Sequence, residues 1–296
     1  MRITPSMMSA STLRDLNSNY ARLTLSQQQM STGKRLSKAS DDPVIAAAAM
    51  TLRSSLGRYE SFDRSTEDAS GWLGAADGAL TASLDRLVRV KELTVRAGNS
   101  GGLSDPNARA AMAAELRAIR ADLISLANTS HNGRSVFAGT AAGDAYTASG
   151  VFQGNSAVVS RDVDPHTVMQ VNVDALAAFG DPAGPGGDLF AVIDRLANAA
   201  ATGDVTALGA AHADLDTATS RLGAATVEVG ARGAQLEQTA ARNASERERI
   251  NTLLSSTEDV DLAQVMVQLK ERENAYQAAL QVAAKVLPPT LVDYLR

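Results

Sequence analysis

The sequence predicts a mainly α-helical fold: a long antiparallel coiled-coil rod of helices with a small β-rich insertion domain in the middle of the chain. The first observation is a series of residues spaced seven apart, apolar at every position but one: Leu208, Leu215, Leu222, Val229, Leu236, Asn243 and Ile250. Such a repeat keeps one seam against a partner helix, and about 43 residues at roughly 1.5 Å each give a seam about 65 Å long. Two further observations are the Asp-Pro steps at 42–43 and 105–106, which mark helix starts, and the Gly-, Thr-, Val- and Asp-rich stretch between 134 and 187.

Composition excludes several classes of function. Aromatic residues make up 4% of the chain, with one Trp, so Ala and Leu must fill the helical core. The formal charge is −5 and the basic residues are scattered among acidic ones, so nucleic acid is not an expected partner. The absence of Cys excludes disulfides, thiol catalysis and Cys metal sites.

No stretch of the sequence predicts a membrane span or a cleaved leader. The longest apolar run is VIAAAAM from Val44 to Met50, far short of the ~20 residues that a membrane helix needs. The opening MRITPSMMSASTLRDLNSNY lacks the apolar core of roughly 7–15 residues of a secretory signal peptide. We therefore expect no membrane partner, and any export would use another route.

The first half of the chain predicts three helices. Apolar residues at helical spacing run from Leu13 to Met30 and predict a first amphipathic helix, which ends before the polar turn 31–42. Asp42 and Pro43 then cap and open a second helix that continues to the glycine-rich loop 98–102. Asp105 and Pro106 open a third helix, which we expect to end near Asn132 and Gly133.

The second half predicts the insertion and three more helices. Within the insertion, Met169, Val171 and Val173 alternate with Gln170 and Asn172 at the period of a half-buried strand. A short helix is predicted from 189 to about 200, followed by the heptad helix to about 255. Asp259 or Asp261 then caps a final helix up to 287, and the tail TLVDYLR could form one last apolar turn.

These elements suggest three parts. Residues 1–40 and 258–296 would form a terminal coiled-coil assembly domain, residues 41–133 and 188–257 a helical rod domain, and residues 134–187 a small β-rich outer insertion. At roughly 50 residues, the insertion is near the lower limit for independent folding, so we expect it to pack on the flanking helices.

Candidate chemical sites are weak. His131, His166 and His212 show no ligand spacing among them, so no metal site is expected. Asp41 and Asp42 could form a catalytic pair, but acids before a proline are better explained as a helix cap. No nucleophile elbow or phosphate-binding glycine loop appears, so we expect neither an enzyme nor a cofactor. Asn243 either fixes the register of the heptad seam or is solvated in a loosely packed stretch, and the sequence leaves both open.

Three strings resemble a known family. They are MSTGKRLSKASDDP at 30–43, LVRVKELTVRAGN at 87–99 and RAAMAAELRAIRADLISLANTSHNGRSVFAG at 109–139. Their order and separation resemble the bacterial flagellin superfamily, over about the first 140 and the last 90 residues. Within it, the run from Asp41 to Val44, where flagellins usually read DDAAGLAI, is most similar to the hook-associated protein 3 family of hook–filament junction proteins. The opening MRITPSMM and the ending LVDYLR also suit that family.

The resemblance implies a structural role in the flagellum. It implies that the terminal helices pair into a coiled coil lining the inner wall of a tube, with the heptad helices outside it and the insertion projecting outward. It also implies self-association into a ring, with hook-associated protein 1 and flagellin as neighbours. The chain would be exported unfolded by the flagellar secretion apparatus to an extracellular location, without a cleaved signal peptide, while a flagellar export chaperone holds the C-terminal helix.

We expect the apolar stripes of the two terminal helices to form mainly intersubunit contacts, with part of them serving as intramolecular core. The predicted subunit-interface residues are Leu13, Leu16, Tyr20, Leu23, Met30, Leu262, Val265, Leu269, Tyr276, Leu280, Leu291 and Leu295. The leading hypothesis is an adaptor in the hook–filament junction. Two alternatives are a short flagellin that forms the filament itself, and an enzyme or ligand-binding protein on a helical scaffold, which no group of residues favours.

Overall fold

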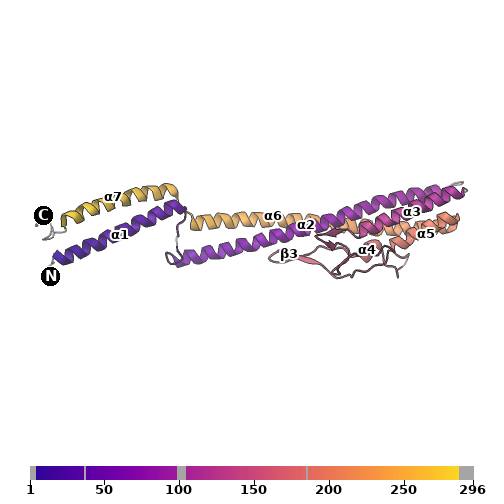
Figure 1. The fold of residues 1–296 in the computed structure, drawn as a ribbon, viewed down its shortest axis with the longest axis horizontal. Helices are drawn as coiled ribbons and strands as arrows, with labels where there is room; N and C mark the ends of the chain where they lie inside the picture. The colour runs from indigo at the N-terminus through magenta and orange to yellow at the C-terminus, as the bar shows by residue number, and fades with distance from the viewer. Residues whose placement is uncertain (1–4, 37, 99–104, 185, 287–296) are drawn as a thin grey trace, which may run out of the picture. The chain divides into compact units, whose positions relative to one another are not determined.

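The computed structural model describes residues 5–36, 38–98, 105–184 and 186–286 (Figure 1). The predicted fold class is confirmed: long helices dominate, and the described strands are short and antiparallel. The elements in chain order are α1 (Pro5–Thr32), α2 (Pro43–Gly98), α3 (Pro106–Ala127), β1 (Ser130–His131), β2 (Arg134–Ser135), β3 (Ser160–Asp164), β4 (Thr167–Gln170), α4 (Ala175–Phe179), α5 (Leu189–Thr202), α6 (Val205–Glu258) and α7 (Leu262–Val286). Residues 99–102 of the predicted glycine loop, and the tail after 286, lie outside the described residues.

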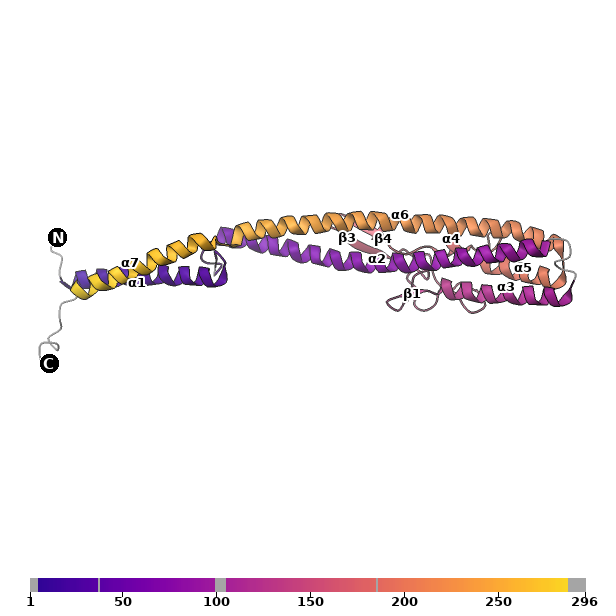
Figure 2. The same cartoon turned by 90° about the horizontal axis from the view of Figure 1, so that it is seen from above.

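The chain divides into two compact units. One, here called the terminal unit, comprises Met1–Arg58 and Glu246–Arg296; the other, the middle unit, comprises Tyr59–Ser245. In the terminal unit α1 packs against α7, and in the middle unit α3 packs against α5 (Figure 2). The three-part division suggested by the sequence stays a prediction.

Aspartate side chains start the helices. Asp42 Oδ1 accepts from the backbone N–H groups of Val44 and Ile45, at 3.1 Å each, as the Asp-Pro step predicted. Asp105, Asp188 and Asp204 play the same part for α3, α5 and α6. Of the two candidates for α7, Asp261 is the cap. Each carboxylate satisfies N–H groups that the first helical turn leaves without an intrahelical acceptor.

Two helix boundaries differ from the expectation. α1 begins at Pro5, before the first apolar residue of the stripe, because Pro suits the first turn of a helix. α3 ends at Ala127, and the predicted end at Asn132 and Gly133 is wrong. Those two residues form the turn of the β1–β2 hairpin, with φ angles of 52° and 76°, as a two-residue Asn-Gly hairpin turn requires.

The heptad seam of α6 is buried along its whole predicted length. Six of its seven members are apolar and at most 4% exposed. Those in the middle unit share one core with α2, α3, α5 and the insertion, so the insertion packs on the flanking helices as expected. Aromatic side chains, few in the chain, concentrate there: the ring of Tyr146 lies within 5.8 Å of the rings of Phe152, Phe179 and Phe190. Burial raises the pKa of Tyr146.

The strand predicted through Val173 is shorter than expected, since β4 ends at Gln170, and the predicted alternation of burial holds for the apolar residues but not for one polar residue. Met169, Val171 and Val173 are buried, but Asn172 is also only 2% exposed. Its Oδ1 accepts from the N–H of Val159 at 2.8 Å and its Nδ2 donates to Ala157 O at 2.9 Å. This buried amide both donates and accepts a hydrogen bond, and so it takes the place of backbone strand pairing beyond the end of β4.

Candidate assembly surface on the terminal helices

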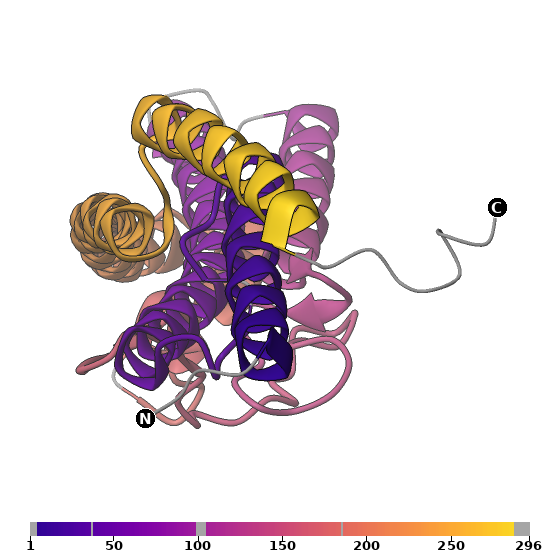
Figure 3. The ribbon, with the colours of Figure 1, turned by 90° about the vertical axis from the view of Figure 1, so that its left-hand side faces the viewer.

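The two terminal helices pack against each other. The rings of Tyr20 in α1 and Tyr276 in α7 lie 5.7 Å apart between centroids. Arg272 of α7 donates from Nη1 to the backbone carbonyl of Arg22, at 2.9 Å, and to Oγ of the buried Ser26. Figure 3 shows the pair from the end, with α7 lying across α1. Part of each apolar stripe is therefore intramolecular, as expected.

The structure brings only some of the predicted interface residues into this contact. Leu23 and Val265 are buried at 8% and 6% exposure, and Leu16, Met30, Leu269 and Tyr276 are half-buried. Leu13, Tyr20, Leu262 and Leu280 remain 42–56% exposed, although the ring of Tyr20 lies beside that of Tyr276. Leu291 and Leu295 lie outside the described residues. One chain therefore leaves apolar surface on both terminal helices uncovered.

Further exposed apolar residues lie on the same helices and were not predicted. They are Met7, Met8 and Leu25 on α1, and Met266, Val267 and Val282 on α7, each at least 38% exposed. Met266 belongs to the apolar stripe predicted for the last helix but was not named as an interface residue. The others were missed because sequence reasoning followed a single stripe per helix, whereas their side chains lie on other faces. Helices with apolar residues on more than one face need more than one neighbour.

The connections at the inner ends of α1 and α7 are hydrogen-bonded to each other. Lys34 and Asp259 form an antiparallel β-bridge. The N–H of Arg35 donates to Glu258 O at 2.5 Å, and the N–H of Val260 donates to Gly33 O at 3.1 Å. Gly33 adopts a positive φ of 66°, which suits glycine. Sequence reasoning treated these segments only as a polar turn and a cap, because pairing between residues over 220 positions apart leaves no local signal.

A charged cluster covers these connections. Glu258, only 4% exposed, lies 2.7 Å from a guanidinium nitrogen of Arg53 and 3.6 Å from Nζ of Lys34. Nζ of Lys34 also donates to Asp259 at 2.6 Å, and this bond raises the pKa of Lys34 and lowers the pKa of Asp259. Through these ion pairs the cluster connects four segments of the terminal unit: the turn after α1, the first turns of α2, the end of α6 and the residues just before α7.

The candidate chemical sites take structural roles. Asp42 caps α2, and Asp41 Oδ2 accepts from the backbone N–H of Lys38 at 2.9 Å. Among the described residues, no group of three or more His, Asp or Glu side chains is arranged to hold a metal ion. Nor is any helix of the described ranges long and apolar enough to cross a bilayer.

Comparison with known proteins shows which family these features resemble. The profile of the bacterial flagellin N-terminal helical region matches residues 3–142, which contain α1, α2, α3 and the β1–β2 hairpin. The chain also resembles hook-associated protein 3 of two bacteria and solved structures of the same kind. Over residues 3–142, just under half of its length, the chain resembles the flagellin family. Flagellin-family proteins of the hook-associated type are structural components of the bacterial flagellum, and this chain is similar to them.

Three relatives illustrate the similarity. Flagellar hook-associated protein 3 of Salmonella typhimurium is 33% identical over 174 residues, covering 58% of this chain and 54% of that protein. The aligned part thus spans about half the length of that relative. Flagellin of Bacillus subtilis is 27% identical over 309 aligned positions, covering all of both chains. A solved structure assigned as a flagellar hook-associated protein of Vibrio parahaemolyticus superposes with a TM-score of 0.68 at 19% identity, covering 74% of this chain and all of that one, which shows a shared fold.

Proposed function

We propose that this protein is a non-enzymatic adaptor of the bacterial flagellum that assembles into a ring joining the hook to the flagellin filament. The observation that carries the proposal is the uncovered apolar surface of the paired helices α1 and α7. Leu13, Tyr20, Leu262 and Leu280 are 42–56% exposed in the single chain. Burial of a fully exposed Leu contributes about 1.5–3 kcal/mol, so covering several of them would drive association of copies.

The neighbours in this proposal follow from the family. Hook-associated protein 1 would lie on the hook side of the ring and flagellin on the filament side. Until assembly, a flagellar export chaperone would cover the C-terminal helix, since exposed apolar faces on a monomer favour aggregation. The protein would reach the extracellular flagellum through the flagellar secretion apparatus without cleavage of a signal peptide.

A second candidate is a short flagellin that forms the filament itself. The observation that favours it is the Bacillus subtilis flagellin, which aligns with this chain over the full length of both. The adaptor is preferred because the Salmonella hook-associated protein 3 shows the higher identity and the Asp41–Val44 run fits the junction proteins.

Loss of the gene separates the two candidates. For an adaptor, cells lacking the protein form normal hooks and release flagellin into the medium. For a filament subunit, the secreted flagellin is itself missing, and the purified protein polymerises into long filaments. Normal filaments on hooks in the deleted strain would contradict both.

A pair of variants tests the assembly surface. Leu13→Ser with Leu262→Ser removes exposed apolar side chains from α1 and α7, and we expect loss of ring formation by sedimentation and electron microscopy. Val168→Ser is the control, because Val168 is 65% exposed but belongs to the middle unit. Removal of residues 262–296 should likewise abolish assembly while Trp72, buried in the middle unit, keeps its native fluorescence.

A further inference from the structure

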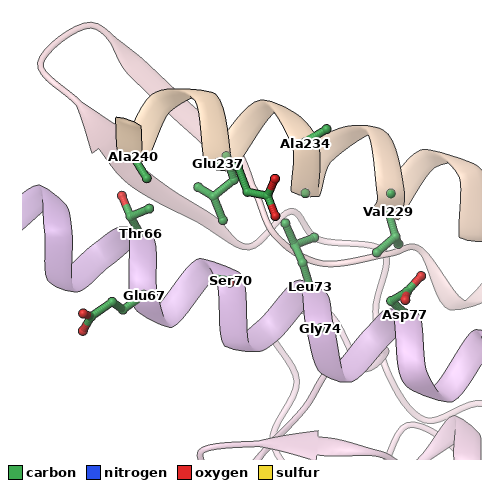
Figure 4. Close-up of a pocket in the computed structure, with 13 residues that line it drawn as sticks. Thr66, Glu67, Ser70, Leu73, Gly74, Asp77, Val229, Ala234, Glu237 and Ala240 are labelled. Carbon is green, nitrogen blue, oxygen red and sulfur yellow. The ribbon is translucent and has the colours of Figure 1, made fainter. Parts of the chain in front are cut away.

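An open groove of about 610 Å³ runs between α2 and α6 in the middle unit (Figure 4). Buried Leu73, Val229 and Leu236 form its apolar floor. Small residues line its sides: Thr66, Ser70, Ala234, Ala240 and three glycines. Within the described residues no other segment lines it, so the groove is open to a segment from outside the chain.

Three helical glycines of the groove meet no neighbouring atom in the single chain, as is also true of Gly57, Gly78, Gly209 and Gly223 outside the groove. Gly74, Gly230 and Gly233 lie in helix interiors, where Gly costs about 1 kcal/mol relative to Ala. A Cβ added at any of them would meet no atom within 4 Å. Gly71 on the same α2 is different, because its Cβ would lie 2.4 Å from the ring of His131. Because glycine has no Cβ, helical glycines that face open space permit close approach of a second backbone.

Carboxylates border the groove. Glu67 and Asp77 on α2 and Glu237 on α6 are exposed, and none of the three forms an ion pair within the described part of the chain. No Lys or Arg lines the groove among the described residues. In Figure 4, Asp77 extends toward α6 and Glu237 toward α2. The groove therefore fits a segment with small residues on its contact face and cations beside them.

The charge of the chain is divided between its two units. Residues 59–245 contain 14 Lys and Arg against 22 Asp and Glu, a formal charge of −8, so the remaining residues carry +3. The net charges of the two units are therefore opposite in sign, which favours contact between unlike units of different copies.

One exposed face of α1 has the required chemistry. Ala10, Arg14, Ser18, Ala21 and Leu25 follow one another at helical spacing and are all exposed. Arg14 and Arg22, which flank the small residues, form no ion pair among the described residues. They are eight residues apart, about 12 Å along a helix, and Glu67 and Asp77 are ten apart, about 15 Å. The two spacings match within the reach of flexible side chains.

We propose that the α2–α6 groove of one copy receives α1 of a second copy, with Arg14 and Arg22 paired to Glu67 and Asp77. The inference rests on the proposed assembly function and names the surface that α1 contacts. Small residues of α1 lie against the groove glycines, and the apolar floor accommodates Leu25. Self-association would then pair charges that form no ion pair in the described part of the single chain.

Cysteine cross-linking tests this contact directly, because the natural chain has no Cys. Ser18→Cys and Ser70→Cys are prepared as separate full-length proteins, mixed, assembled and oxidised mildly. We expect a disulfide-linked dimer in the mixture that neither variant forms alone, since a disulfide needs Cα atoms within about 7 Å. Ser220→Cys, exposed on α6 away from the groove, replaces Ser70→Cys as the control and should give no such dimer.

Charge exchange tests the pairing. Glu67→Arg with Asp77→Arg in the Ser70→Cys protein should reduce the cross-link yield severalfold, and Arg14→Glu with Arg22→Glu in the Ser18→Cys protein should restore it. Failure of restoration, or assembly with no cross-link between residues 18 and 70, overturns the inference while leaving the assembly function intact. Failure of the unmodified protein to assemble at all would instead contradict the proposed function.

Discussion

Asn243 of α6 donates a hydrogen bond from Nδ2 to the backbone carbonyl oxygen of Val163 in β3, at 2.7 Å. The amide is 1% exposed, so it is not solvated, and its Oδ1 has no partner among the described residues. The polar residue in the heptad seam therefore binds the strand of the insertion. A buried polar group with a single partner position favours one register of helix and strand.

Asn243→Ala should lower the free energy of unfolding by about 1–3 kcal/mol, because it leaves the buried carbonyl of Val163 without a donor. Urea unfolding followed by the fluorescence of Trp72 measures this change in the middle unit. Gln238→Ala, at an exposed position on α6, is the control and should change stability by less than about 0.5 kcal/mol. Equal effects of the two variants would contradict a specific role for the amide.

The lowered pKa of Asp68 in α2 should make the stability of the protein depend on pH. Burial opposes ionisation of Asp68, but Arg161 at 2.7 Å, together with Asn132 and His131, outweighs it and holds the pKa below its ordinary value of 3.8. A lowered pKa in the folded state means that the carboxylate contributes stability above about pH 4, which is lost as the pH falls through the folded-state pKa.

Asp68→Asn should therefore cost about 1–2 kcal/mol at neutral pH and make stability less sensitive to pH below about 4. Urea unfolding at a series of pH values measures both effects. Asp162→Asn in β3 is the control, as Asp162 is exposed and forms no ion pair with any described residue. A wild-type protein and an Asp68→Asn variant with parallel pH profiles would show that Arg161 does not stabilise the folded carboxylate.

A side chain at position 71 should destabilise the protein. In Gly71→Ala the new Cβ would lie 2.4 Å from Cε1 of His131, so the ring must leave its place beside Trp72. We expect a loss of about 1–3 kcal/mol, the usual cost of overpacking. Gly78→Ala on the same helix meets no atom within 4 Å and should instead gain up to about 1 kcal/mol from helix propensity. Thermal unfolding of the two variants should shift in opposite directions.

Glu258 should control local opening of the terminal unit. Glu258→Gln removes the charge that faces Arg53 and Lys34, leaving two cations close to each other. We expect faster hydrogen exchange at the amides of Arg35 and Val260, which join the two connections, and little change in the middle unit. Lys270→Gln, on the exposed surface of α7, is the control, and equal exchange in both variants would exclude a role of Glu258 in this junction.

Local sequence determined most of the helices. The Asp-Pro steps located the starts of α2 and α3, because a carboxylate cap and a fixed proline φ act within one turn. The repeat from Leu208 to Ile250 identified α6 and its buried face, since seven-residue spacing places the side chains on one line. The apolar stripes of α1 and α7 indicated the candidate assembly surface, because spacings of three and four residues place side chains on one helical face.

Only the tertiary structure decided which residues meet across the chain. It showed that Asn132 and Gly133 form a hairpin turn, that Asn172 and Asn243 are buried by distant backbone partners, and that Glu258 joins two connections over 220 residues apart. It also decided which part of each terminal stripe remains exposed. The Asn-Gly turn is a local signal that was overridden by the helical pattern before it. The other contacts depend on how segments far apart in the sequence pack, whereas propensity and periodicity act over a few neighbouring residues, so no local pattern encodes them.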